Sequence, residues 1–339
     1  YPPSLALLLM QLHINAWIFT GLLMLSILGF AWLWLRETTS HPLALLLIVC
    51  SLEVLTSLHG GNVELLLLFA TLLAAWLLWR QHGLFAAPLI TLVVVIKPFY
   101  ALFFVAFGLF QLIGQGVPTK QLLRTLAITV GVTLLLVALE VIRWGAARRA
   151  EAIFYFRHAL DYQWFGLLVA QQTPMSIWNR TAMQALVSTG LSASVAQWLA
   201  LALWAIAVGM TLWRVRGQRL DFPLVFALAF VLLYWGRPVG WGLIYLEAVV
   251  LLTLWPLMQS WRRWLLTLAV IALMASRWWA FILTAQGYGM PLLTLQRADL
   301  PWETWIVLPG SWLLLLGSLS SSVPTVRLPI RPTQTIESR

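Results

Sequence analysis

One of the two lysines of this chain stands inside a long apolar run, in the stretch TLVVVIKPFYALFF, and Pro98 follows it directly. An ammonium in hydrocarbon is costly, so an intramembrane lysine is by default a candidate functional residue. Lys97 has the chemistry to bind an anion such as a phosphate and to stabilise charge that develops on it. The alternative is that its long side chain only extends to the membrane interface.

Acidic residues also lie well inside apolar runs. Glu53 and Glu247 each stand six residues from a polar turn, which is about 9 Å along a helix. Buried acids at matched depth predict a polar cavity that is open to one face of the membrane, and we assign Glu53, Glu64 and Glu247 to it. Hydrogen bonds between neighbouring helices are the alternative role for these carboxylates.

The composition is that of a polytopic membrane protein. Of the 339 residues, 61% are hydrophobic and 9% are charged, and the 21 tryptophans are typical of membrane interfaces. The net charge of +10 suits contact with anionic membrane lipid or lipid phosphate. The basic residues are scattered over loops and form no stripe, so nucleic acid is not expected as a partner. The single cysteine, Cys50, predicts neither a disulfide nor a metal cluster.

Apolar runs of spanning length predict an all-α protein with about 11 membrane spans. The run from Leu84 to Leu112 decides this number, because a single helix there would be about 43 Å long and would bury Lys97 near its middle. A break at Lys97-Pro98, which proline favours, gives two short spans and brings Lys97 to a membrane face. The other predicted spans are residues 14–35, 41–58, 62–79, 124–142, 193–213, 222–235, 241–257, 264–283 and 305–319.

Loop charge favours the break, because most basic residues then gather on one side, as cytoplasmic loops require. They are Arg36, Arg80, Lys120, Arg124, Arg214, Arg216, Arg219, Arg262, Arg263, Arg327, Arg331 and Arg339. The extracytoplasmic side then carries Lys97, the turn at 59–61, the loops at 236–240 and 286–303, and a long loop at 144–192. Residues 1–320 are expected to form one multi-span domain, and 321–339 a disordered cytoplasmic tail.

The long loop at 144–192 is basic although it lies on the side where positive charge is disfavoured. A bound anion would explain this, and the alternative is that long loops escape the charge rule. The loop contains a single aspartate, Asp161, and the sequence Asn179-Arg180-Thr181.

Five segments together resemble the polyprenyl-phosphate-mannose-dependent mannosyltransferases of glycosyltransferase family 87. They are YPPSLALLL at Tyr1, HGGNVELLLLFATLLAAWLLWR at His59, VVVIKPFYALFF at Val93, PMSIWNRTAMQAL at Pro174 and YWGRPVGWGLIYLEAV at Tyr234. The chain also departs from the family pattern. The Gly-Gln-x-Asn of the family reads Gly60-Gly61-Asn62 here, its late Ser-Pro reads Arg237-Pro238, and the aromatic residue expected shortly after Trp241 is displaced to Tyr245. These departures leave the sugar open.

The resemblance implies the C-type glycosyltransferase architecture, with a large extracytoplasmic loop, in the plasma (inner) membrane of bacteria. It implies transfer of a hexose, mannose, from a polyprenyl-phosphate-sugar donor to a lipid or glycan acceptor, with inversion at the donor carbon. No cofactor is implied, and no carboxylate cluster indicates a metal. The absence of a Gly-rich phosphate loop disfavours a direct nucleotide-sugar donor.

The site residues follow from the same resemblance. Lys97 is expected to pair with the lipid phosphate and not with a buried carboxylate. The general base of the family lies in a first outer loop that would precede Tyr1, and Asp161 is the fallback candidate. The residues expected to bind the donor phosphate or sugar are Lys97, Arg237, His59, Asn62, Asn179, Trp241 and Tyr245.

Purely structural roles are the alternative for several of these residues. Arg237 and Trp241 would also serve as interface anchors, and His59 would serve as a cap of the turn that follows it. At the level of the whole chain, a transporter or flippase for a lipid-linked glycan or another anion is the alternative function, because intramembrane acids and outward arginines suit transport. The repeats typical of transporters are not found in the sequence, which favours the enzyme.

Overall fold

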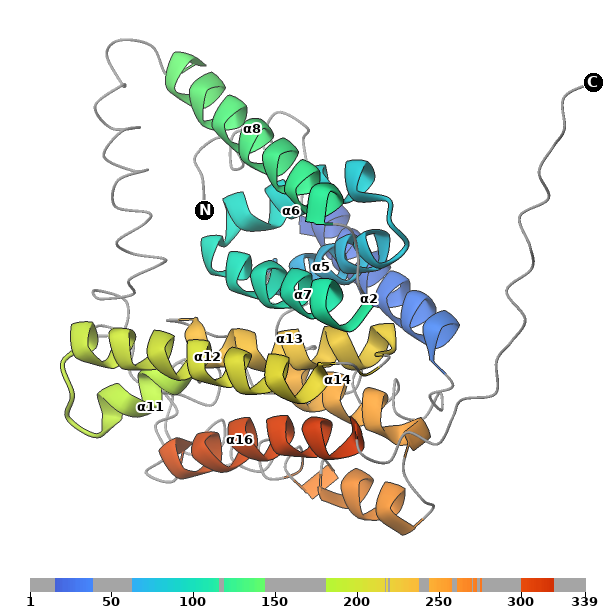
Figure 1. Ribbon diagram of the computed structural model, residues 1–339, viewed down its shortest axis with the longest axis vertical. Coiled ribbons are helices and arrows are strands. Elements are labelled where there is room, and N and C mark those ends of the chain that lie inside the picture. The colour runs from blue at the N-terminus through green and yellow to red at the C-terminus, as the bar shows by residue number, and fades with distance from the viewer. Residues whose placement is uncertain are drawn as a thin grey trace, which may run out of the picture.

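The computed structural model describes residues 16–38, 63–115, 119–143, 181–216, 218, 220–237, 244–257, 261–269, 271–272, 275 and 300–319. Within these ranges every regular element is a helix (Figure 1), so the prediction of an all-α chain is confirmed for them.

The N-terminal helices are α2 (Ala16–Glu37), α5 (Glu64–Trp79), α6 (Gly83–Ile96), α7 (Ala101–Gln115) and α8 (Thr119–Arg143). The later helices are α11 (Ala182–Ser188), α12 (Ala193–Val215), α13 (Phe222–Gly236), α14 (Ile244–Leu254) and α16 (Leu300–Ser318), with the short 3-10 helices η1 (Pro98–Tyr100) and η3 (Trp255–Leu257). Most of these bounds lie within a few residues of the predicted spans. The predicted span at 41–58 and the end of the one at 264–283 lie outside the described residues.

Three of the described helices are long and apolar enough to cross a membrane, namely α2, α8 and α12. Helices α5, α6 and α13 are apolar but shorter, and so are the apolar stretches Pro98–Ile113 around α7 and Thr304–Ser318 within α16. The chain is therefore a helical membrane protein, whereas the number of about 11 spans stays a prediction. Of the long loop predicted at 144–192, the structure describes the last part, which contains α11.

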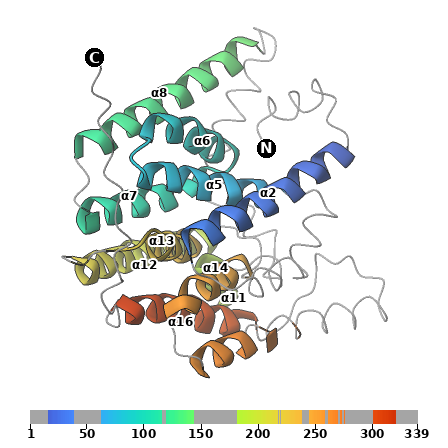
Figure 2. The same cartoon turned by 90° about the vertical axis from the view of Figure 1, so that its right-hand side faces the viewer.

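Helix α13 lies in the middle of the described fold. It packs against α7, α12, α14 and α16, and it also contacts α5 and α2. Helix α5 packs on α2 and α6, and α8 covers α6 at the edge of the molecule (Figure 2). A helix that is hydrophobic all round is expected to be buried, and every residue of α13 from Leu224 to Gly236 is buried.

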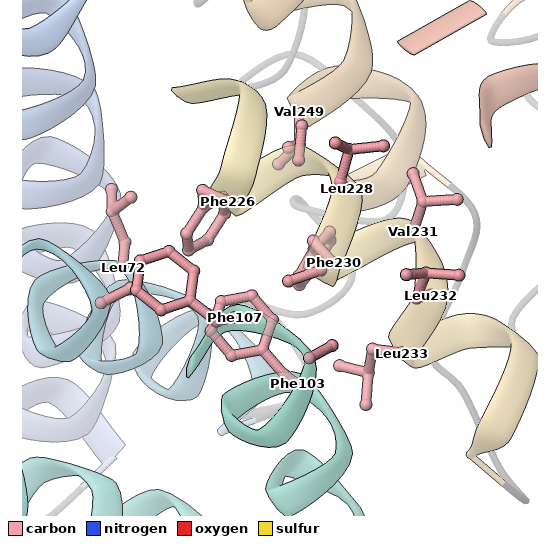
Figure 3. Close-up of a cluster of buried hydrophobic side chains, with 14 of the residues drawn as sticks. Leu72, Phe103, Phe107, Phe226, Leu228, Phe230, Val231, Leu232, Leu233 and Val249 are labelled. Carbon is pink, nitrogen blue, oxygen red and sulfur yellow. The ribbon is translucent and has the colours of Figure 1, made fainter. Parts of the chain in front are cut away.

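Aromatic side chains fill the contact between α7 and α13 (Figure 3). The rings of Phe103 and Phe226 meet edge to face at a centroid distance of 5.2 Å, and Phe226 stacks on Phe230 at 5.8 Å. Residues four apart on a helix lie on the same face, so phenylalanines at this spacing form a continuous row along α13. Aromatic pairs add to the stabilisation that area burial alone provides.

The break predicted at Lys97-Pro98 is confirmed. Helix α6 ends at Ile96, and Lys97 has an extended backbone (φ −138°, ψ 92°) before Pro98 opens η1. Proline disfavours the helical region for the residue before it, which explains this extended conformation. The amide of Lys97 still donates to the carbonyl of Val93 at 2.9 Å and closes α6, so the interruption is one residue wide.

The C-terminal end of α5 lies beside basic residues that are predicted to share one side of the membrane. Arg80 donates to both carboxylate oxygens of Glu37, at 2.9 and 3.2 Å, and the indole of Trp76 donates to the same carboxylate at 2.9 Å. Glu37 ends α2 directly after Arg36. The structure thus places Arg36 and Arg80 at one end of the α2–α5 pair, as predicted.

Candidate active site: a buried charge cluster at a helix break

The carboxylate of Glu64 is buried, and three side chains of the described residues donate to it. The ammonium of Lys97 bonds to its Oε2. The hydroxyl of Tyr100 donates to Oε1 at 2.8 Å, and Nη1 of Arg237 donates to the same oxygen at 3.2 Å. We call Glu64, Lys97, Tyr100 and Arg237 the Glu64 cluster.

All four members of the Glu64 cluster stand at or next to the end of a helix. Glu64 is the first residue of α5, and Arg237 follows the last residue of α13. Lys97 and Tyr100 flank the break between α6 and α7. The Arg80–Glu37 ion pair is at the other end of α5, about 24 Å away along its 16 residues. The cluster and the basic end of the molecule therefore lie at opposite ends of α5.

Arg237 is held on several sides. Its side chain has no exposed surface, and its guanidinium carbon lies 3.9 Å from the ring centre of Tyr234 and 5.5 Å from that of Phe99. A guanidinium over an aromatic face gains cation–π attraction, most of all where water is excluded. Burial works to lower the pKa of Arg237, but Tyr234 and Glu64 raise this pKa by more, so the guanidinium is protonated.

Exposure separates the two cations of the cluster. The side chain of Lys97 is 20% exposed, whereas that of Arg237 is fully buried and that of Glu64 is 3% exposed. Buried charges persist only where they are paired and hydrogen-bonded. Lys97 is thus the more exposed cation of the cluster, while the buried Arg237 contacts Glu64 from inside the protein.

Two of the predicted site residues, Lys97 and Arg237, lie close together. This agrees with the prediction that both stand on the same side of the membrane. The expectation that Lys97 has no buried carboxylate as its partner is wrong, because its ammonium bonds to Glu64. The expected contact between Lys97 and a lipid phosphate stays a prediction. The physical reason is that both residues stand at helix ends that converge, where an ammonium away from bulk water needs a counter-charge. Glu64, assigned to a polar cavity, is the centre of the cluster.

Glu247, the other described acid of the predicted cavity, is 5% exposed. It stands in the first turn of α14, which packs against α13. The side chains of Glu53, His59, Asn62, Asp161, Asn179, Trp241 and Tyr245 lie outside the described part of the structure, and their roles stay predictions. Asn179 precedes by two residues the buried Thr181, whose hydroxyl accepts from the amide of Gln184 and caps α11. Among the described residues, no group of three or more His, Cys, Asp or Glu is placed to hold a metal ion.

Tyr100 is the site residue that sequence reasoning missed. It follows Lys97 by three residues, and the single turn of η1 carries both side chains to the same carboxylate. A tyrosine one turn beyond a lysine-proline break was the available signal.

We expect Tyr100→Phe to lower the free energy of unfolding by about 1.5–3 kcal/mol, because it removes a hydrogen bond to a charged group and keeps the ring. Chemical unfolding in detergent micelles, followed by tryptophan fluorescence, measures this. The matched control is Thr71→Val, which also removes one hydroxyl from a fully buried side chain, but a hydroxyl that bonds to no described residue. Equal stability of Tyr100→Phe and the wild type would show that the bond to Glu64 contributes nothing.

These observations define a class of protein, a helical membrane protein with a buried charge cluster at an interruption of its helices. The chain belongs to glycosyltransferase family 87, whose sequence pattern matches residues 1–236. The match includes Glu64, Lys97 and Tyr100 and ends one residue before Arg237. Searches of curated proteins and of solved structures gave no match. The chain is therefore a membrane glycosyltransferase.

Proposed function

We propose that this protein transfers a hexose, mannose, from a polyprenyl-phosphate donor to a lipid or glycan acceptor at the extracytoplasmic face of the bacterial plasma (inner) membrane. The observation that carries the proposal is the Glu64 cluster. It offers a partly exposed ammonium, backed by a buried carboxylate and guanidinium, at a helix break in a chain of glycosyltransferase family 87.

The reaction needs a cation where the leaving group gains charge. The acceptor hydroxyl oxygen forms a bond to the anomeric carbon of the sugar, and the bond from that carbon to the phosphate oxygen breaks. The electron pair leaves with the lipid phosphate, whose charge the ammonium of Lys97 stabilises. Attack from the face opposite the phosphate inverts the configuration at that carbon.

Arg237 and Glu64 have positioning roles in this proposal. Glu64 accepts bonds from both cations and sets the place of the ammonium, and the bonds from Arg237 and Tyr100 orient the carboxylate. A positioned ammonium is worth more than a mobile one, because no reorganisation is needed when charge develops on the phosphate.

The proton of the acceptor hydroxyl must go to a base within hydrogen-bond reach. Asp161 is the candidate on this chain, and His59, Asn62, Asn179, Trp241 and Tyr245 are the candidate contacts to sugar and phosphate. These residues lie outside the described side chains. Asp161 is the fallback candidate because it is the single aspartate of the long loop, and the other assignments rest on the family pattern.

The test is a transfer assay with the purified full chain in lipid nanodiscs, without nucleotide sugar. We expect label to pass from a polyprenyl-phosphate-[14C]mannose to an added glycolipid acceptor. Polyprenyl-phosphate-glucose is the matched donor control for the sugar. Absence of transfer from every lipid-phosphate hexose, together with substrate-dependent flux in vesicles, would favour the transporter and overturn the proposal.

A further inference from the structure

An apolar groove of about 520 Å³ runs between α6, α7 and α8. This volume is in the range of sites that bind small molecules. The residues that line the groove carry no charge, and most are leucine, valine or another hydrocarbon side chain. Two threonines of the lining, Thr125 and Thr133, turn their hydroxyls to carbonyls of their own helix, so they add little polarity. The groove is therefore built for hydrocarbon.

The groove is open and long. Leu126 and Leu134 belong to its lining and are more than half exposed, so its side on α8 is not sealed by protein. The lining on α8 extends from Thr119 to Leu134, which is about 22 Å along the helix and most of the thickness of a hydrocarbon core. A long, thin and flexible hydrocarbon fits this shape better than a compact ligand.

One end of the groove lies along the chain on both sides of the break at Lys97-Pro98. Val94 lines the groove three residues before Lys97, and Ala101 lines it directly after Tyr100. The other end lies near Thr119 and Leu122, where Gln121 donates to the carbonyl of Gln81 at 2.9 Å. One end of the groove thus lies at the helix break that contains Lys97, and the groove leads from there toward the start of α8.

We propose that this groove holds the isoprenoid chain of the lipid-phosphate donor, with the phosphate at Lys97. The inference rests on the proposed function and adds to it the path of the chain. A phosphate bound at Lys97 must leave its hydrocarbon somewhere apolar, and the groove begins one helical turn from that lysine. The phosphate would contact the ammonium of Lys97, and the isoprenoid chain would contact the hydrocarbon lining of the groove. One ligand would therefore occupy both the charged and the apolar part.

Gly108 gives a direct test. It lines the groove on α7, and a Cβ built on it has nothing within 4 Å, so Gly108→Leu fills the groove without a clash at its first atom. Gly131→Leu on α8 is the matched control, because its Cβ also meets nothing within 4 Å and it is not part of the lining. Both variants gain the same helix propensity.

The kinetic measurement compares two donors with the same sugar phosphate, one with a full-length polyprenyl chain and one with two isoprene units. Loss of contact with about two CH₂ groups corresponds to roughly a tenfold change. We expect Gly108→Leu to raise KM for the long donor about tenfold, with an unchanged KM for the short donor and an unchanged kcat. Equal behaviour of Gly108→Leu and Gly131→Leu toward both donors would overturn the groove proposal while the proposed function stands.

A binding measurement separates the groove from the reaction. Native mass spectrometry of the detergent-solubilised chain compares retention of polyprenyl phosphate with that of phosphatidic acid. We expect Gly108→Leu, and not Gly131→Leu, to retain at least threefold less polyprenyl phosphate, even if wild-type protein transfers no sugar. A loss confined to phosphatidic acid would show that an ordinary phospholipid fills the groove, with Lys120 and Arg124 near its other end as the headgroup partners, and would overturn the proposal.

Discussion

Lys97→Met should lower kcat for transfer from the lipid-phosphate donor about 100- to 1000-fold, with a much smaller loss of stability. In other enzymes, removal of one preorganised donor at the atom where charge develops lowers kcat by about this factor. Methionine keeps the length of the side chain and loses only the ammonium. Glu64 retains Tyr100 and Arg237 as partners, so the fold does not acquire an unpaired carboxylate.

The control for the Lys97 experiment is Arg80→Met, which also removes one cation of an ion pair. Arg80 is half exposed and bonds to Glu37 at the far end of α5 from the cluster. A general effect of charge on membrane insertion or on lipid contact would lower the activity of both variants equally. The assignment of Lys97 predicts that Arg80→Met keeps its kcat. If Lys97→Met also keeps its kcat, Lys97 is an interface anchor and the phosphate site lies elsewhere.

The break at Lys97-Pro98 could be predicted from sequence because its cause is local. Proline lacks an amide hydrogen and restricts the residue before it, so an apolar run too long for one span had one natural place to divide. The helices follow in the same way from runs of apolar residues between charges and turns. Local rules of this kind do not depend on how the helices pack.

The partner of Lys97 could not be predicted in the same way. Glu64 precedes Lys97 by 33 residues, and Arg237 follows Glu64 by 173. Which carboxylate receives both cations depends on how α5, α7 and α13 converge, and no local rule fixes this. One signal was present in the sequence. Phe222, Phe226, Phe230 and Tyr234 recur every four residues and lead to Arg237, which marks one face of α13 as the wall against which the guanidinium stacks.

Glu64→Gln should cost about 3–5 kcal/mol of unfolding free energy, more than any single change to its cations. Removal of one partner of a buried ion pair leaves the other charge unpaired in a medium of low dielectric. Here one carboxylate serves two cations, and Arg237 has no exposed surface through which water could solvate it. Glutamine keeps the shape and one carbonyl oxygen, so the loss reports the charge. Chemical unfolding in detergent micelles measures it.

Glu37→Gln is the matched control within the same chain. It neutralises a carboxylate that also binds an arginine and an indole, but Arg80 is half exposed, and exposed ion pairs contribute about 0–1 kcal/mol. The double variant Glu64→Gln/Lys97→Met gives a sharper result. With the ammonium removed as well, one fewer cation loses its bond to the carboxylate, so the double variant should be more stable than the sum of the two single losses by about 0.5–3 kcal/mol. Strict additivity would mean that Glu64 and Lys97 do not interact, and the charge cluster could then not be what positions the ammonium for phosphate.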